Sequence, residues 1–190
     1  MKTTLNKIRD HAPCKDGWEK LLKHLGKTKA DGEPLSLLTI LDSNGLDYAL
    51  WCLRAVDGYD KEMRLFAVWC ARKVQHLMTG QRSLDALDVA EKYAHGQATH
   101  EELEAARAAA IYAAWDAARA PERSAASDSA RHAASDSARN AAMAAKRDSA
   151  WDAAWAAATS AAWASVWAAA RAEQETEFKR MLNAIEEQVE

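Results

Sequence analysis

Alanine in the second half of the chain restricts the fold more than any other feature of the sequence. It supplies 34 of the last 90 residues, and it has the highest helix propensity because its side chain loses no conformational freedom in a helix. Only seven Gly and three Pro residues interrupt the chain. No stretch alternates apolar and polar residues as a half-buried strand does. We therefore predict an all-α protein: a multi-helix bundle with a long Ala/Trp-rich C-terminal helical region.

Helix start and stop signals predict several separate helices in the first 120 residues. Ser83 as an N-cap and Gly96 in a left-handed C-terminal position delimit one helix. Thr99 and Glu102 form a capping box for the next helix. The turn-forming SNG at 43–45 breaks an apolar run into two helices. The expected helices are 3–11, 16–25, two within 34–56, 60–78, 83–96 and 99–120.

The length of the chain suits one domain with its own hydrophobic core. We expect a single helical domain over 1–172, in which the Ala-rich helices begin at about residue 98. A charged amphipathic helical tail follows at 173–190. Its apolar residues recur at helical spacing and suit packing on the domain or on a second copy of the chain; they are Phe178, Leu182, Ile185 and Val189.

Charge and cysteine content narrow the class of protein. A net charge of −3 provides neither the basic stripe of a nucleic-acid binder nor the strong acidic excess of a DNA mimic. The odd set Cys14, Cys52 and Cys70 is typical of a reducing compartment, so we predict a cytoplasmic protein. The uncharged stretch 153–170 just reaches the length of a membrane span, but its Ala, Ser and Thr content favours a buried helix. No membrane partner is expected.

Sequence motifs for catalysis and metal binding are missing. The chain has no Gly-rich phosphate loop and no H-E-x-x-H, C-x-x-C or G-x-S-x-G motif. We therefore predict no cofactor, no metal and no catalytic residue. A nucleotide hydrolase is the least favoured function, because the acidic cluster at 101–104 lies at a helix start, where acidic residues are expected anyway.

An eight-residue repeat stands in the Ala-rich region, where SAASDSAR at 124–131 is followed by HAASDSAR at 132–139. Each repeat advances around a helix by about 80°, so equivalent side chains spiral slowly. The three-residue spacing of Asp and Arg permits local ion pairs. One interpretation is a solvated helix. The other is a partner-binding surface formed by Asp128, Arg131, Asp136 and Arg139.

A second candidate site combines polar and aromatic side chains. Arg72 and His76 are four residues apart on the expected 60–78 helix, so they should share a face. Guanidinium groups suit a partner carboxylate or a phosphate; the alternative is that they pair with Asp and Glu on neighbouring helices. The candidate ligand- or partner-binding residues are Asp47, Trp51, Arg54, Arg64, Trp69, Arg72, His76 and Arg82.

Residues 45–120 resemble a known family at GLDYALWCLRAV, RLFAVWCARKVQHL and RSLDALDVAEKYAHGQATHEELEAARAAA. The family consists of immunity proteins that bacteria and phages encode, related to the immunity proteins of polymorphic-toxin systems. The resemblance implies an all-α protein that binds and neutralises a toxin. The residues that match its recurring pattern are Asp47, Trp51, Arg54, Arg64, Trp69, Cys70, Arg72, His76, Arg82, Ser83, Glu91 and Tyr93.

The sequence therefore favours two functions. The first is a non-enzymatic immunity or counter-defence protein that neutralises a toxin or defence protein by direct binding, and a homodimer is compatible with it. The second is a helical protein that sequesters a small nucleotide-like ligand in a pocket lined by Trp and Arg. The expected lining of that pocket is Trp51, Trp69, Arg54, Arg72 and His76.

Overall fold

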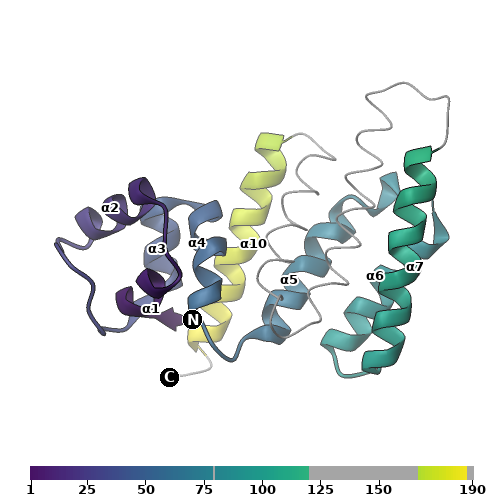
Figure 1. The fold of residues 1–190 in the computed structure, drawn as a ribbon, viewed down its shortest axis with the longest axis horizontal. Helices are drawn as coiled ribbons and strands as arrows, with labels where there is room; N and C mark the ends of the chain where they lie inside the picture. Colours follow the sequence, from purple (N-terminus) through teal and green to yellow (C-terminus); the bar gives the residue numbers. More distant parts are fainter. Residues whose placement is uncertain (79, 120–166, 188–190) are drawn as a thin grey trace. The chain divides into compact units, whose positions relative to one another are not determined.

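The computed structural model describes residues 1–78, 80–119 and 167–187 of the 190-residue chain (Figure 1). Of these residues, 74% are helical; they form eight α-helices and one very small sheet. The prediction of an all-α fold is confirmed. Within the described part of the chain, no helix has the length and apolar character that a bilayer crossing requires. The repeat residues Asp128, Arg131, Asp136 and Arg139 lie outside the described residues.

The chain divides into two compact units. Unit 1 comprises Met1–Tyr59 and Glu175–Glu190, and unit 2 comprises Asp60–Gln174. This division differs from the expected limits of 1–172 and 173–190, because the C-terminal segment is grouped with the N-terminal helices. The boundary falls inside the last helix, α10 (Trp167–Glu187). The two units are described separately below.

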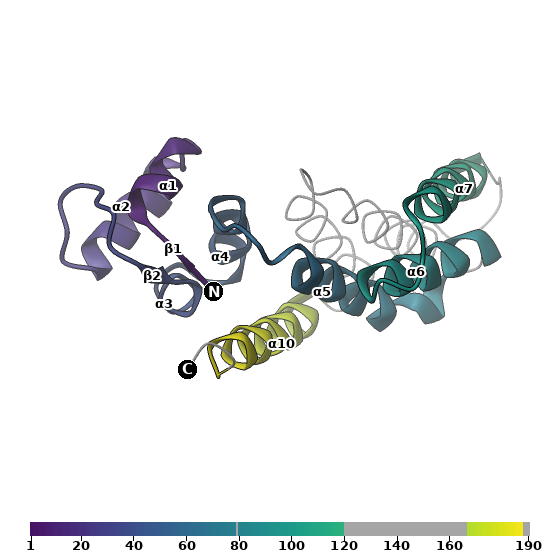
Figure 2. The ribbon, with the colours of Figure 1, turned by 90° about the horizontal axis from the view of Figure 1, so that it is seen from below.

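Unit 1 consists of short helices around a two-stranded sheet. Strand β1 pairs antiparallel with β2, so that Lys2 lies opposite Ser36 and Thr3 opposite Leu35 (Figure 2). Each strand has only two residues, too few for alternation to appear in the sequence. The elements are β1 (Lys2–Thr3), α1 (Leu5–Asp10), α2 (Lys15–His24), β2 (Leu35–Ser36), α3 (Leu37–Asn44), α4 (Leu46–Cys52), the 3-10 turn η1 (Leu53–Ala55) and the later part of α10.

Local sequence signals set several helix limits in unit 1. The Thr4 hydroxyl accepts a hydrogen bond from the Lys7 amide at the start of α1. At the start of α3, the Ser36 hydroxyl accepts one from the Leu38 amide. Such caps satisfy amide groups that have no partner within the helix. Gly45 separates α3 from α4 with φ +86°, a left-handed conformation that glycine adopts without steric cost. The predicted break at 43–45 is therefore confirmed.

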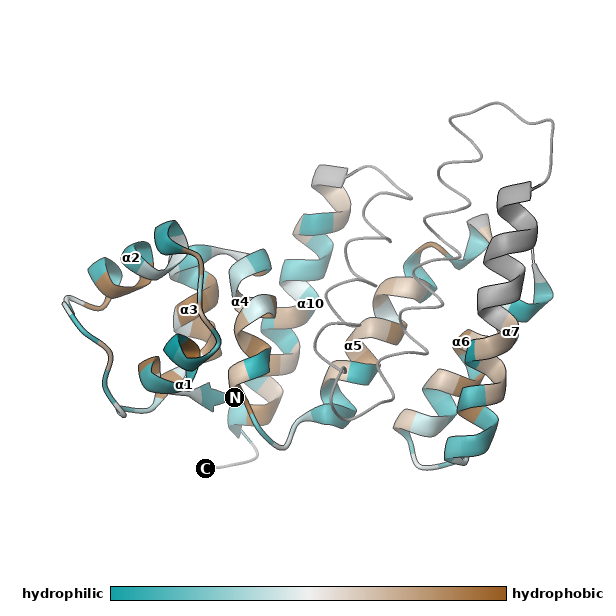
Figure 3. Ribbon diagram, viewed as in Figure 1, coloured by the Kyte–Doolittle hydropathy of each residue, from teal (hydrophilic) through white to brown (hydrophobic). Residues whose placement is uncertain are grey.

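The core of unit 1 is aliphatic and includes one face of α10, as the apolar residues on α3 and α10 in Figure 3 illustrate. Phe178 and Leu182 are fully buried and Ile185 is nearly so. Polar contacts tie this helix to the N-terminal segments: Ser36 Oγ donates to Glu186 Oε1 at 2.6 Å, and the Met1 amine lies 3.7 Å from the same oxygen. Phe178, Leu182 and Ile185 therefore pack on the chain's own helices, as one of the two predictions has it, whereas Val189 lies outside the described residues.

Unit 2 is built on α5 (Asp60–Lys73), the 3-10 turn η2 (Gln75–Leu77), α6 (Gln81–Ala94) and α7 (His100–Arg119). Helix α6 lies between α5 and α7 and contacts both (Figure 1). The Thr99 amide donates to Glu102 Oε2 at 2.7 Å, and the Glu102 amide donates to Thr99 Oγ1 at 3.2 Å. The predicted capping box is thus confirmed. Gly96 has φ +72°, also as predicted.

Two predicted helix limits in unit 2 are wrong. Helix α5 ends at Lys73, not at residue 78, because Val74 has φ −113° and a 3-10 turn follows. Helix α6 begins at Gln81 with Gly80 as N-cap, so Ser83 is not a cap. Ser83 is instead almost completely buried on the face that carries Ala86 and Leu87. The small side chain is used for packing inside the unit.

Candidate functional site

Three side chains of unit 1 stack along one side of α4 and η1. Tyr48, Trp51 and Arg54 follow one another at intervals of three residues, which places them on one helical face. The rings of Tyr48 and Trp51 are 5.7 Å apart with an interplanar angle of 27°. Arg54 Cζ lies 4.2 Å from the centre of the Trp51 ring, and Arg54 Nε donates to the Trp51 carbonyl at 3.1 Å. We call these three half-buried residues the aromatic ladder.

Helix α2 holds the first member of the ladder in place. A Cβ atom at Gly17 would lie 2.2 Å from Tyr48 Cε2 and 3.0 Å from Cys14 Sγ, so the ring occupies the space that any other residue needs. Asn44 Nδ2 donates to the Gly17 carbonyl at 2.8 Å and keeps α2 at this distance. Tyr48 is therefore wedged against the backbone of α2.

The interior edge of the ladder is apolar. The Tyr48 hydroxyl is buried and has no hydrogen-bond partner among the described residues. Burial raises the pKa of Tyr48, and the nearby Cys52 and Cys14 raise it further. Burial likewise raises the pKa of the Cys52 thiol to about 12, although Arg54 opposes this effect. Both groups therefore stay protonated and neutral near neutral pH.

Asp47 is the remaining predicted site residue in unit 1. It is exposed in the first turn of α4, where a carboxylate interacts favourably with the helix dipole. Of the predicted set, Asp47, Trp51 and Arg54 lie in unit 1, and the structure brings Arg54 onto Trp51. Sequence reasoning missed Tyr48, Gly17 and Cys14. The interval of three from Tyr48 to Trp51 was the only local signal for the stack.

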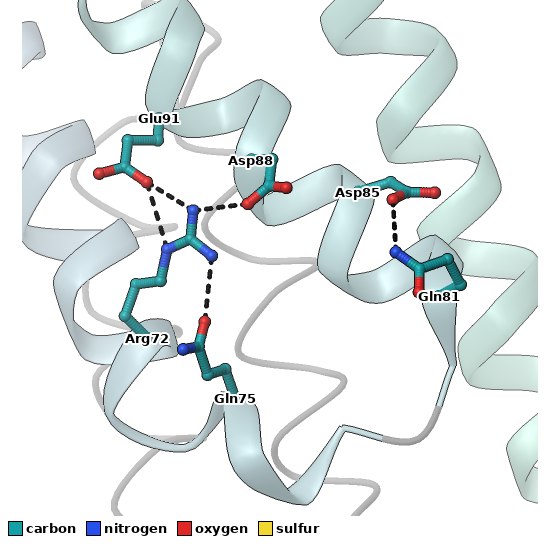
Figure 4. Close-up of polar contacts among 6 residues, drawn as sticks. All are labelled: Arg72, Gln75, Gln81, Asp85, Asp88 and Glu91. Atoms are coloured by element: carbon teal, nitrogen blue, oxygen red, sulfur yellow. Dashed lines mark hydrogen bonds and ion pairs between the residues drawn. The ribbon is translucent and has the colours of Figure 1, made fainter.

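Arg72 in unit 2 is held by acidic residues of α6 (Figure 4). Its Nη2 atom lies 2.6 Å from Asp88 Oδ1 and 2.5 Å from Glu91 Oε2. Its Nε also donates to Glu91, and its Nη1 donates to Gln75 Oε1 at 3.0 Å. Burial lowers the pKa of Arg72, but the hydrogen bonds with Glu91 and Asp88 outweigh this effect and raise the pKa. Arg72 clamps α5 to α6, which confirms the pairing alternative for this residue.

Two other predicted residues of unit 2 pack against aromatic rings. Arg64 Cζ lies 5.4 Å from the centre of the Tyr93 ring. The Trp69 ring stacks on Phe66 at 6.3 Å, and Lys73 Nζ lies 5.0 Å from its centre. Each ring is therefore already covered in part by a side chain of its own unit.

His76 and Arg82 are both exposed, on η2 and at the start of α6 respectively. The prediction that His76 shares a helical face with Arg72 is wrong, because α5 ends between them at Lys73. The predicted site residues thus fall into two sets: three belong to unit 1 and the other five to unit 2.

The comparisons with known proteins identify no relative. No family model, no curated protein and no solved structure matches this chain. The resemblance to immunity proteins therefore stays a prediction. Within the described residues, no group of three His, Cys, Asp or Glu side chains is placed to hold a metal ion. The candidate site is the aromatic ladder of unit 1, in which two rings and a guanidinium stack on one another.

Proposed function

We propose that this chain is a non-enzymatic binding protein that neutralises a toxin or defence protein by direct contact, with the aromatic ladder as its anchor. The stack of Tyr48, Trp51 and Arg54 carries the proposal. Trp, Tyr and Arg are the residue types most enriched among the few that dominate binding energy at protein interfaces. Stacking also orders the three side chains before binding, which lowers the entropy lost on association.

The toxin or defence partner comes from the family resemblance, two of whose matched residues, Trp51 and Arg54, belong to the ladder. We place the function in the cytoplasm. The structure pairs none of the three cysteines in a disulfide and leaves Cys14 exposed, an arrangement suited to a reducing compartment.

The nucleotide-sequestering alternative receives less support. Of the two arginines in its expected lining, Arg54 stacks on Trp51, and the Arg72 guanidinium is already engaged by Asp88, Glu91 and Gln75. A phosphate would have to displace two carboxylates at contact distance. Isothermal titration with a nucleotide panel checks this point, and we expect no heat of binding.

The proposed function is tested by affinity capture of the tagged chain from its host, followed by affinity measurements on the captured partner. We expect Trp51→Ala to weaken binding about 30-fold or more, the effect of an interface hot spot of about 2 kcal/mol. The matched control is Trp69→Ala, which removes a half-buried tryptophan of unit 2 that stacks on Phe66. Circular dichroism verifies the helix content of both variants.

Two results would contradict the proposal. One is a Trp51→Ala variant that binds the captured partner as tightly as the original chain. The other is an equal loss of affinity in Trp69→Ala. Light scattering during gel filtration tests the homodimer separately: a dimer that dissociates in Trp51→Ala would make a second copy of the chain the partner of the ladder.

A further inference from the structure

Positive charge is concentrated at the N-terminal end of the chain. Residues 1–30 contain eight Lys and Arg against three Asp and Glu, a net charge of +5, within a chain whose total is −3. The other 160 residues therefore carry −8. This segment forms β1, α1, α2 and the start of the following loop, all in unit 1.

Many of these cations remain available to a partner. Lys7, Lys15 and Lys27 form ion pairs with carboxylates of unit 1. Five others are exposed and have no carboxylate partner among the described residues; they are Lys2, Arg9, Lys20, Lys23 and Lys29. Of the three acidic residues in the segment, Glu19 pairs with Lys15. The free cations thus outnumber the two free carboxylates.

The basic helices border the aromatic ladder. Helix α1 contacts η1, and Lys7 of α1 pairs with Asp57 at 2.8 Å, three residues beyond Arg54. Helix α2 lies against Tyr48 through Gly17. Lys20 follows Gly17 by three residues, so it lies on nearly the same side of α2. The two helices that carry most of the unpaired cations, α1 and α2, therefore both lie next to the elements that form the ladder.

We infer that the partner bound at the ladder presents an acidic protein face to α1 and α2. This inference rests on the proposed function and specifies the chemistry of its partner. Opposite charges around an apolar anchor accelerate encounter and fix the orientation of the two proteins. Residues 1–30 of unit 1 supply the positive charges of that arrangement, and the partner supplies the negative charges.

A lipid surface fits these observations less well. A helix that binds a membrane surface buries its apolar face in the headgroup region. In α2 that side is used inside the protein, because Leu21 is fully buried and Gly17 lies against Tyr48. Nucleic acid is the competing polyanion and is an alternative outcome of the test below, because the same cations attract phosphates.

The test uses the full chain and fluorescently labelled poly-L-glutamate as an acidic probe, with binding followed by anisotropy. Lys20→Glu/Lys23→Glu is compared with Lys61→Glu/Lys92→Glu, which reverses two exposed lysines on α5 and α6 of unit 2. Both double variants change the net charge equally. We expect the first to bind about tenfold more weakly than the original chain and the second to bind almost unchanged, with all binding suppressed at about 1 M salt.

Three outcomes overturn the inference: no binding of poly-L-glutamate by the original chain, an equal loss in both double variants, or tighter binding to duplex DNA or to phosphatidylserine vesicles. Trp51→Ala should bind the acidic probe normally, because the probe has no ring to pack on the ladder. A failed partner capture therefore counts against the proposed function, whereas a failed charge reversal counts against the acidic-partner inference.

Discussion

Gly17→Ala tests how the ladder is held. Gly17 is the third residue of α2, and replacing glycine by alanine in a helix stabilises a protein by up to about 1 kcal/mol, because alanine loses less backbone entropy on folding. At Gly17 the new Cβ would lie 2.2 Å from Tyr48 Cε2 and 2.7 Å from Cδ2, distances that real Cβ contacts do not reach. The Tyr48 ring must move, although it stacks on Trp51 and its hydroxyl is buried.

The expected magnitude follows from these opposing terms. Overpacking of this kind costs about 1–3 kcal/mol, and the helix propensity of alanine returns about 1 kcal/mol. We expect Gly17→Ala to lower the free energy of unfolding by up to about 2 kcal/mol. In a Tyr48→Ala background the clash with the ring is absent and only the 3.0 Å contact with Cys14 Sγ remains, so the same substitution should stabilise by up to about 1 kcal/mol. The coupling between the two positions is therefore about 1–3 kcal/mol.

Urea unfolding followed by circular dichroism measures these changes in the four chains of the cycle. Gly32→Ala is the control, because its Cβ would meet only Asn6 Nδ2, at 3.8 Å, an ordinary contact. The reasoning is refuted if Gly17→Ala changes the free energy of unfolding by the same amount with and without the Tyr48 ring.

Three further predictions concern other parts of the chain. Iodoacetamide should modify Cys14 alone in the native protein, because the other two cysteines are buried; mass spectrometry showing a second early adduct would contradict this. Arg72→Met should cost about 1 kcal/mol in urea unfolding at low salt, since its pairs with Asp88 and Glu91 are partly exposed, and less at 1 M NaCl. A salt-independent loss would contradict the ion-pair origin. The hydrogen bond from Lys27 lowers the pKa of Asp31, so its stabilisation is present above about pH 4, the unfolded value, and disappears as the pH falls through the folded value. The melting temperature of Lys27→Met should therefore fall less than that of the original chain between pH 5 and pH 3, and parallel pH profiles would exclude this role.

Local chemistry made much of the fold predictable. The break at Gly45, the left-handed Gly96 and the Thr99–Glu102 box each depend on residues within four positions of one another. Such signals act before any tertiary contact forms. The buried face of α10 was also predictable from a local pattern, because the helical spacing of its apolar residues identifies that face.

Features that depend on distant residues were not predictable. The contact of Gly17 with Tyr48 joins residues 31 positions apart, and neither residue is unusual in its own helix. Ser83 has the chemistry of an N-cap, but its environment in the packed unit makes it a buried small residue. The two-unit division depends on the return of α10 to the N-terminal helices, which no local pattern encodes.

Arg54 and Arg72 show why a list of arginines does not define a site. Both were predicted to bind a partner, and both carry the same fork of donors. On α6, Asp88 and Glu91 stand three residues apart, so both reach the Arg72 guanidinium, which then joins two helices. Arg54 instead stacks on the ring three residues before it, at 4.2 Å, which orders the guanidinium beside a half-buried tryptophan. The role of each arginine is set by its neighbours, and of these two it is Arg54 that combines an ordered cation with an aromatic ring a partner can cover.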